Sequence, residues 1–235
     1  MQLSKNEEKA YELLRKNKLE VFRIKDIALL LNINKMKTYN LIKALKKKNV
    51  IDTLSSGIYS LQNTSDFVAG AYLNWPSYVS FLSALNYYGF SDNLPRKITY
   101  ASVKYKKHDK FFYACLSKKR FFGYIKVGDI LIADKEKAFV DSLLFPKYSG
   151  GIKEVSRLLL ENIDILNIDK LIDYSMKIGV KMVLRRLGFI LEKKLNKQKI
   201  NLLLTKIGRG YGFLDPSIKK RKNLNKKWLL YADLE

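Results

Sequence analysis

The first 61 residues contain short helical segments followed by a hairpin, and this order limits how the chain can fold. Ser4 and Glu7 have the spacing of a capping box at the start of a first helix. Apolar spacing predicts a second helix over 25–31 and, after a tight turn, a third over 34–48. Residues 50–61 alternate around a Ser-Ser-Gly turn, which indicates a β-hairpin. This succession predicts a winged helix-turn-helix domain over residues 1–62.

The expected third helix combines an apolar side with a very basic one. Thr38, Leu41, Ile42 and Leu45 recur at helical spacing and should face the core, while Asn34 is suited to cap the first turn. The helix carries no acid and six lysines: Lys35, Lys37, Lys43, Lys46, Lys47 and Lys48. A basic second helix in a helix-turn-helix is typical of proteins that bind double-stranded DNA in the major groove.

Residues expected to contact DNA lie on the outer side of this helix and at the hairpin turn. They are Asn34, Lys35, Met36, Lys37, Tyr39, Asn40, Lys43, Lys47, Ser55 and Ser56. Lys35, Lys37 and Asn40 are the candidates for base edges, because Asn favours adenine and Lys favours guanine. The lysines at 46–48 are expected to contact phosphates or to remain solvated. Two alternatives stay open: the hairpin only closes a small core, or the winged helix binds protein.

The chain is strongly basic along its whole length. Lys and Arg number 45 against 22 Asp and Glu, which leaves +23, and residues 1–61 hold +7 of this charge. Such a charge attracts polyanions. Lysines that only solvate the surface would give the same composition, and adsorption to anionic lipid is a weaker alternative.

Neither a disulfide nor a membrane span is expected. Cys115 is the only cysteine, and no N-terminal segment resembles a signal peptide. No apolar run approaches the roughly 18 residues that a span requires. We therefore expect a cytoplasmic protein.

The remaining residues, 63–235, predict a larger body, which makes the chain an α+β protein. As an alternative to a single domain, this body could divide into two lobes, 63–146 and 147–235. Helices are expected over 67–90, 135–145, 152–161, 167–178 and 180–194. Strands are expected over 97–103, 111–116, 121–127, 129–133, 199–205 and 227–232. The pattern indicates a mostly antiparallel sheet with a helical subdomain.

Two stretches of the body are especially basic. Between Arg96 and Lys126, ten basic groups accompany one acid. Aromatic residues alternate with these groups, so this stretch could form a surface that binds the phosphate backbone of a nucleic acid. In the alternative interpretation, the aromatic residues pack inward and the lysines protect exposed sheet edges. Residues 206–227 hold eight basic groups and one acid, and the glycine-rich segment 208–212 within them is expected to be a mobile turn.

No set of catalytic groups is evident. The single histidine, His108, would have to meet Cys115 to form a dyad. Glu136 and Asp141 are five residues apart on one expected helix and point in different directions. We therefore expect no enzymatic activity, no metal and no cofactor.

Four stretches of the body form an ordered set: 78–90, 133–141, 185–192, and 214–216 followed by Trp228. In this order they resemble motifs of the AbiEi antitoxin family, the transcriptional regulators of type IV toxin–antitoxin systems in abortive infection. Their matching polar positions are Ser83, Glu136, Asp141, Arg185, Arg186 and Asp215. Structural roles such as helix caps, buried ion pairs and turns are expected for Ser83, Glu136, Asp141 and Asp215. For Arg185 and Arg186, a direct contact with a partner is an open alternative.

The resemblance implies a repressor that binds inverted repeats in its own promoter, as a monomer or a dimer. It also implies that the C-terminal region opposes a nucleotidyltransferase-type toxin in antiviral defence without a stable complex. Two alternatives remain. One is a regulator whose body senses a ligand or partner, and the other is a nucleic-acid enzyme that uses carboxylates.

Overall fold

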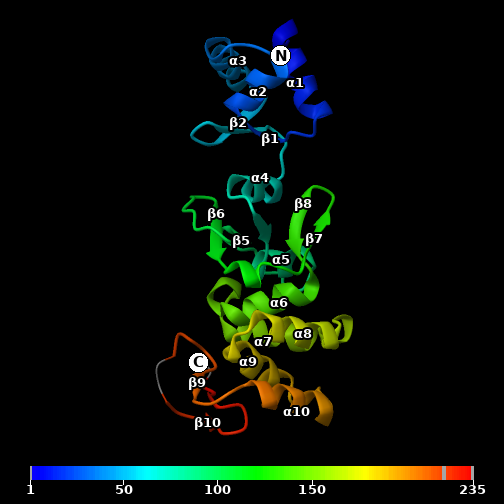
Figure 1. Ribbon diagram of the computed structural model, residues 1–235, viewed down its shortest axis with the longest axis vertical. Coiled ribbons are helices and arrows are strands. Elements are labelled where there is room, and N and C mark those ends of the chain that lie inside the picture. Colours follow the sequence, from blue (N-terminus) through cyan, green and yellow to red (C-terminus); the bar gives the residue numbers. More distant parts are fainter. Residues whose placement is uncertain (1, 219–220, 234–235) are drawn as a thin grey trace. The chain divides into compact units, whose positions relative to one another are not determined.

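A computed structural model describes residues 2–218 and 221–233 and divides the chain into two compact units, 1–76 and 77–235 (Figure 1). The described residues form ten α-helices and three sheets, so the chain is an α+β protein, as predicted. The division follows Pro76 rather than residue 62, because α4 (Asp66–Leu73) packs against strands of the first unit.

The first unit contains the predicted three helices and hairpin, together with one strand that was not predicted. Its elements are α1 (Lys5–Lys16), β1 (Val21–Arg23), α2 (Ile24–Leu31), α3 (Lys35–Lys47), β2 (Ile51–Ser55), β3 (Ile58–Leu61) and α4. The strands form an antiparallel sheet in the order β1-β3-β2. At the start of α1, the Ser4 amide donates to Glu7 Oε2 at 2.7 Å, as the capping-box spacing predicts.

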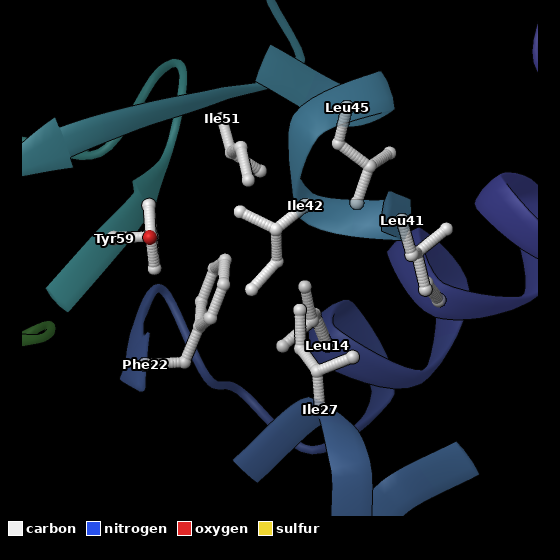
Figure 2. Close-up of a cluster of buried hydrophobic side chains, with 9 residues drawn as sticks. Leu14, Phe22, Ile27, Leu41, Ile42, Leu45, Ile51 and Tyr59 are labelled. Carbon is white, nitrogen blue, oxygen red and sulfur yellow. The ribbon is translucent and has the colours of Figure 1, made fainter. Parts of the chain in front are cut away.

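An apolar cluster joins every element of this small sheet and the helices α1–α3 (Figure 2). Its buried members are Ala10, Leu14, Phe22, Ile27, Leu41, Ile42, Leu45, Ile51 and Tyr59. Complete burial of a leucine or isoleucine side chain contributes roughly 1.5–3 kcal/mol. Leu14, Ile27 and Leu45 are each no more than 1% exposed, so they hold α3 firmly against α1 and α2.

The second unit is built on a five-stranded sheet in the order β6-β5-β4-β8-β7. Its strands are β4 (Ser77–Val79), β5 (Ile98–Ser102), β6 (Phe111–Cys115), β7 (Tyr124–Val127) and β8 (Ile130–Ala133). The prediction of a mostly antiparallel sheet was wrong, because β5 pairs parallel with β6 and β4 pairs parallel with β8. The Lys107–Phe112 bridge shows how the β5–β6 connection doubles back along the outer side of β6, which makes the parallel pairing possible.

The single helix predicted over 67–90 is in fact three elements. α4 ends at Leu73, β4 occupies the centre of the sheet, and α5 (Phe81–Tyr87) follows. Pro76 does not start a helix here. Proline disfavours a helical conformation in the residue before it, and Ser77–Val79 pair with β5 on one side while Val79 also pairs with β8 on the other.

Helix α6 (Lys135–Leu144) is the centre of the helical layer and packs against α5, α7, α8 and α9. The other helices agree with the predicted positions: α7 (Ile152–Glu161), α8 (Ile168–Ile178) and α9 (Lys181–Leu191). Short 3-10 turns lie at Lys118–Arg120, Pro146–Ser149 and Ile163–Ile165. Residues 136–143 are all buried, so polar side chains on α6 need partners inside the protein.

The C-terminal segment differs most from the prediction. Residues 199–205 were predicted as a strand but lie in α10 (Lys197–Lys206), where Asn196 Oδ1 accepts from the Lys199 amide at 2.9 Å. The short strands β9 (Gly212–Phe213), β10 (Leu224–Asn225) and β11 (Leu230–Tyr231) form a small mixed sheet. The basic stretch 206–227 includes residues 219–220, which lie outside the described residues. None of the described helices is long and apolar enough to cross a membrane.

Candidate nucleic-acid interface

The turn before α3 is fixed by two hydrogen bonds. Asn34 Oδ1 accepts from the Lys37 amide at 2.9 Å, as its predicted capping role requires. Thr38 Oγ1 donates to the Asn34 carbonyl at 2.9 Å. Asn32 adopts a left-handed conformation, with φ of 52°, and ends α2. The entry point and direction of α3 are therefore set by residues of the turn itself.

The inner side of α3 is the one predicted from its spacing. Thr38, Leu41, Ile42 and Leu45 are buried, and the three apolar side chains point into the cluster of Figure 2. The outer residues are exposed, as predicted: Lys35, Met36, Lys37, Tyr39, Asn40, Lys43, Lys46 and Lys47. Among the described residues, the five lysines on this side make no ion pair. The helix therefore presents five uncompensated positive charges to solvent.

Lys48 does not belong to this exposed set. Its Nζ lies 2.5 Å from Glu7 Oε2 and 3.0 Å from the Gln2 carbonyl. The hydrogen bond from Lys48 holds the pKa of Glu7 below its usual value. Lys48 was predicted to contact phosphate or to remain solvated; the structure pairs it with an acid instead, because the folding of α1 beside α3 supplies Glu7.

The hairpin packs against α3 through β2, and a groove lies between α3 and β3. Ser55 ends β2 and is half-buried, while Ser56 lies in the turn and is exposed. A shallow groove of about 320 Å³ separates α3 from β3 and is lined by Tyr39, Asn40, Ile42, Lys43, Lys46 and Tyr59. Lys35 Nζ lies 5.9 Å from the centre of the Tyr39 ring. Cationic and aromatic groups thus occupy the same side of the unit.

In the second unit, the motif residue Asp141 belongs to a fully buried polar network. It forms an ion pair with Lys137 one turn earlier on α6, and both side chains are 0% exposed. Lys137 Nζ donates to Tyr78 Oη at 2.8 Å, and Ser80 Oγ donates to Asp141 at 2.8 Å. Sequence analysis missed Lys137 and Tyr78, although the i, i+4 spacing of Lys137 and Asp141 was a usable signal. This network joins α6 to the central strand β4.

Glu136 and Ser83 also make contacts within the fold. Glu136 accepts from the Asn167 amide at 3.0 Å and pairs with Lys170 at 2.9 Å, which anchors the start of α8. Burial alone would raise the pKa of Glu136, but the Asn167 amide and Lys170 lower it below its usual value. Ser83 Oγ accepts from the Thr99 amide at 2.9 Å and so ties α5 to β5.

Arg185 and Arg186 are buried and bind backbone carbonyls. Arg185 donates to the carbonyls of Ile207 and Arg209 at 2.9 and 3.0 Å. Arg186 donates to those of Leu143 and Leu214 at 2.7 and 2.9 Å. Burial lowers the pKa of Arg186 to about 10, so its guanidinium remains charged at neutral pH. Arg185 and Arg186 therefore face the interior of the fold, and Arg185 attaches the segment 208–212 to α9 through the Arg209 carbonyl.

The last motif residues complete the same anchoring. Asp215 Oδ1 accepts from the Ser217 amide at 2.8 Å, which makes it a turn residue, as expected. Trp228 is fully buried, and its Nε1 donates to Glu192 at 2.8 Å. Gly188 faces this ring so closely that a Cβ would lie 2.0 Å from it. The motif positions therefore hold the C-terminal segment on α9.

The remaining candidate groups do not converge. His108 stacks on Phe111 with ring centres 4.9 Å apart, and Cys115 is exposed at the end of β6. In the part of the chain that the structure describes, no group of three or more His, Cys, Asp or Glu side chains is placed to hold a metal ion. Tyr100, Phe111 and Tyr113 of β5 and β6 are buried and pack inward, whereas Tyr105 in the loop between these strands is 73% exposed.

A comparison with solved structures finds a similar fold. The crystal structure of the RV2827C protein from Mycobacterium tuberculosis matches with a TM-score of 0.67 and 11% sequence identity, covering 97% of this chain and 92% of that one. No protein-family model matches the sequence, and no curated protein is similar to it. At this identity the match establishes a shared fold over nearly the whole chain.

Proposed function

We propose that the first unit is a winged helix that binds double-stranded DNA, with α3 in the major groove and the β2–β3 hairpin as the wing. The observation that carries this proposal is the outer side of α3, where five exposed lysines have no acidic partner in the part of the chain that the structure describes. The order of helices and strands supports it, because α1 and α2 support α3 from behind and leave its outer side open. The shared fold with RV2827C adds no functional argument.

We further propose that the chain is a sequence-specific transcriptional repressor of its own promoter and a type IV antitoxin. This rests on the resemblance of its motifs to the AbiEi family. The matching polar residues lie at contacts that join α5, α6, α8 and α9 to their neighbours. A resemblance at these positions therefore concerns residues that support the fold. The surface that would oppose a nucleotidyltransferase-type toxin is then made by other residues of the second unit.

The salt dependence of binding tests the DNA proposal. The full chain would be titrated with a duplex from upstream of its own gene, at several salt concentrations. Five lysines that each displace one counterion give a slope of log K against log salt of about −4.5. A slope near zero, or tighter binding to an acidic protein surface than to DNA, would reject α3 as a DNA-binding helix.

Matched charge-removal variants locate the binding site. A triple variant, Lys35→Ala with Lys37→Ala and Lys43→Ala, should lose most affinity. The control removes three lysines of the second unit, Lys193, Lys194 and Lys197, which are exposed and make no ion pair with any residue that the structure describes. If the control weakens binding as much as the α3 variant does, net charge and not α3 explains the affinity.

The antitoxin proposal needs its own experiment. Co-expression with the neighbouring reading frame should relieve toxicity if that frame encodes a nucleotidyltransferase-type toxin. The α3 triple variant should lose repression and retain this protection. A neighbouring product that is harmless when expressed alone would end the antitoxin proposal and leave the DNA proposal standing.

A further inference from the structure

We propose that α3 reads A·T base pairs, with Asn40 bound to an adenine and Met36 against the methyl group of a neighbouring thymine. The inference rests on the proposed function, in which α3 enters the major groove. It differs from the expectation drawn from sequence, which placed Lys35 and Lys37 at the base edges together with Asn40.

The buried residues of α3 define which side chains point most directly outward. Successive helical residues are rotated by about 100°. With Thr38, Leu41 and Leu45 buried, the positions directly opposite the core are Met36, Asn40, Lys43 and Lys47. Lys35 and Lys46 lie on one flank of this line, and Lys37 lies on the other. A helix in the major groove has a sugar-phosphate strand on each flank, so the flanking lysines are placed for phosphates and the central line for bases.

Asn40 is the amide side chain of α3 that remains available for a base. Asn34 Oδ1 is occupied by the cap of α3, and Thr38 Oγ1 is bonded to the Asn34 carbonyl. The Asn40 side chain is exposed and makes no hydrogen bond among the described residues. Its amide offers one acceptor and a donor side by side, which is the pattern complementary to adenine N6 and N7.

Met36 lies one turn before Asn40 and is 71% exposed. An apolar side chain this exposed, in the middle of a lysine-rich surface, gains most from an apolar partner, and the thymine C5-methyl is the apolar group on the floor of the major groove. α3 contains no arginine, the residue best suited to guanine, and no carboxylate to accept from cytosine. Lys43 and Lys47 are on the same line but lie further along the helix, beyond the N-terminal residues that contact bases, so they are assigned to phosphates.

The experiment measures preference and affinity separately with the full chain. A bound motif would first be selected from a random duplex library. Fluorescence anisotropy competition at one salt concentration would then compare two duplexes of equal length that carry this motif, one with A·T pairs at its centre and the other with G·C pairs. Wild type should prefer A·T, and Asn40→Ala should reduce that preference by about tenfold. Lys47→Ala is the control and should weaken both duplexes alike.

Uracil in place of thymine tests the role of Met36, because it removes only the methyl group. Wild type should lose about fourfold in affinity for the uracil duplex, whereas Met36→Ala should bind both duplexes equally. Tight binding with no A·T preference, or an unchanged preference in Asn40→Ala, would overturn this inference and leave the proposed function intact. Failure of wild type to bind any duplex would overturn both.

Discussion

The two units of this chain use charged residues in opposite ways. On α3 the lysine side chains are exposed and make no ion pair among the described residues, whereas Glu136, Asp141, Arg185 and Arg186 of the second unit are buried and have partners within the fold. Lys137 with Asp141, and Arg185 and Arg186 with carbonyls, all serve to hold elements together. A charged residue at a recognisable motif position is therefore a poor guide to a binding site unless its burial is known.

The largest expected effect is the loss of the buried ion pair in the second unit. Asp141→Ala leaves the Lys137 ammonium buried without its carboxylate, which should destabilise the protein by about 3–5 kcal/mol. Chemical denaturation would measure this loss. The exposed α8 residue Asp173 offers a control, Asp173→Ala, with the same charge change.

A double variant sharpens this test. Lys137→Met with Asp141→Leu removes both charges and should recover much of the lost stability. DNA affinity should be unchanged in Asp141→Ala under conditions where it is folded. If Asp141→Ala costs no more than the Asp173 control, the contrast between the units fails.

A smaller effect should separate two neighbouring lysines at the end of α3. Lys47→Ala should make the salt slope of DNA binding about 0.9 less steep, because one phosphate contact is lost. Lys48→Ala should leave the slope unchanged but lower the unfolding temperature, because Glu7 loses its partner. If Lys48→Ala made the salt slope as shallow as Lys47→Ala does, Lys48 would contact DNA in spite of its ion pair with Glu7.

The smallest effect is confined to acid pH. Because the pKa of Glu136 is lowered on folding, its contacts stabilise the protein fully above the unfolded value near 4.5 and are lost as pH falls through the folded value. Glu136→Gln should therefore flatten the acid side of a plot of unfolding temperature against pH. Asp173→Asn should leave that plot as it is in wild type. An unaltered acid side in Glu136→Gln would mean that the contact with Asn167 and Lys170 does not form.

Sequence reasoning succeeded where one element carries its own signal. The capping pair at Ser4, the cap at Asn34 and the buried side of α3 depend on residues a few positions apart, and each was correct. It failed where a short apolar run fits two structures, as at 199–205, and where a single helix was predicted over 67–90, across Pro76. Neither the strand β1 nor the parallel pairing of β5 with β6 has a local signal, because both depend on the path of the chain between distant segments.

The amino-acid sequence by itself determined that α3 has an apolar inner side and a lysine-rich outer side, because helical periodicity and side-chain charge are properties of neighbouring residues. Only the tertiary structure decided which charges remain available to a ligand. Lys48 is paired by α1, Lys137 and Asp141 are enclosed by the packing around α6, and Arg185 and Arg186 are covered by the C-terminal segment. Burial and pairing arise when segments far apart in the chain meet, and the spacing of residues along one helix does not contain that information.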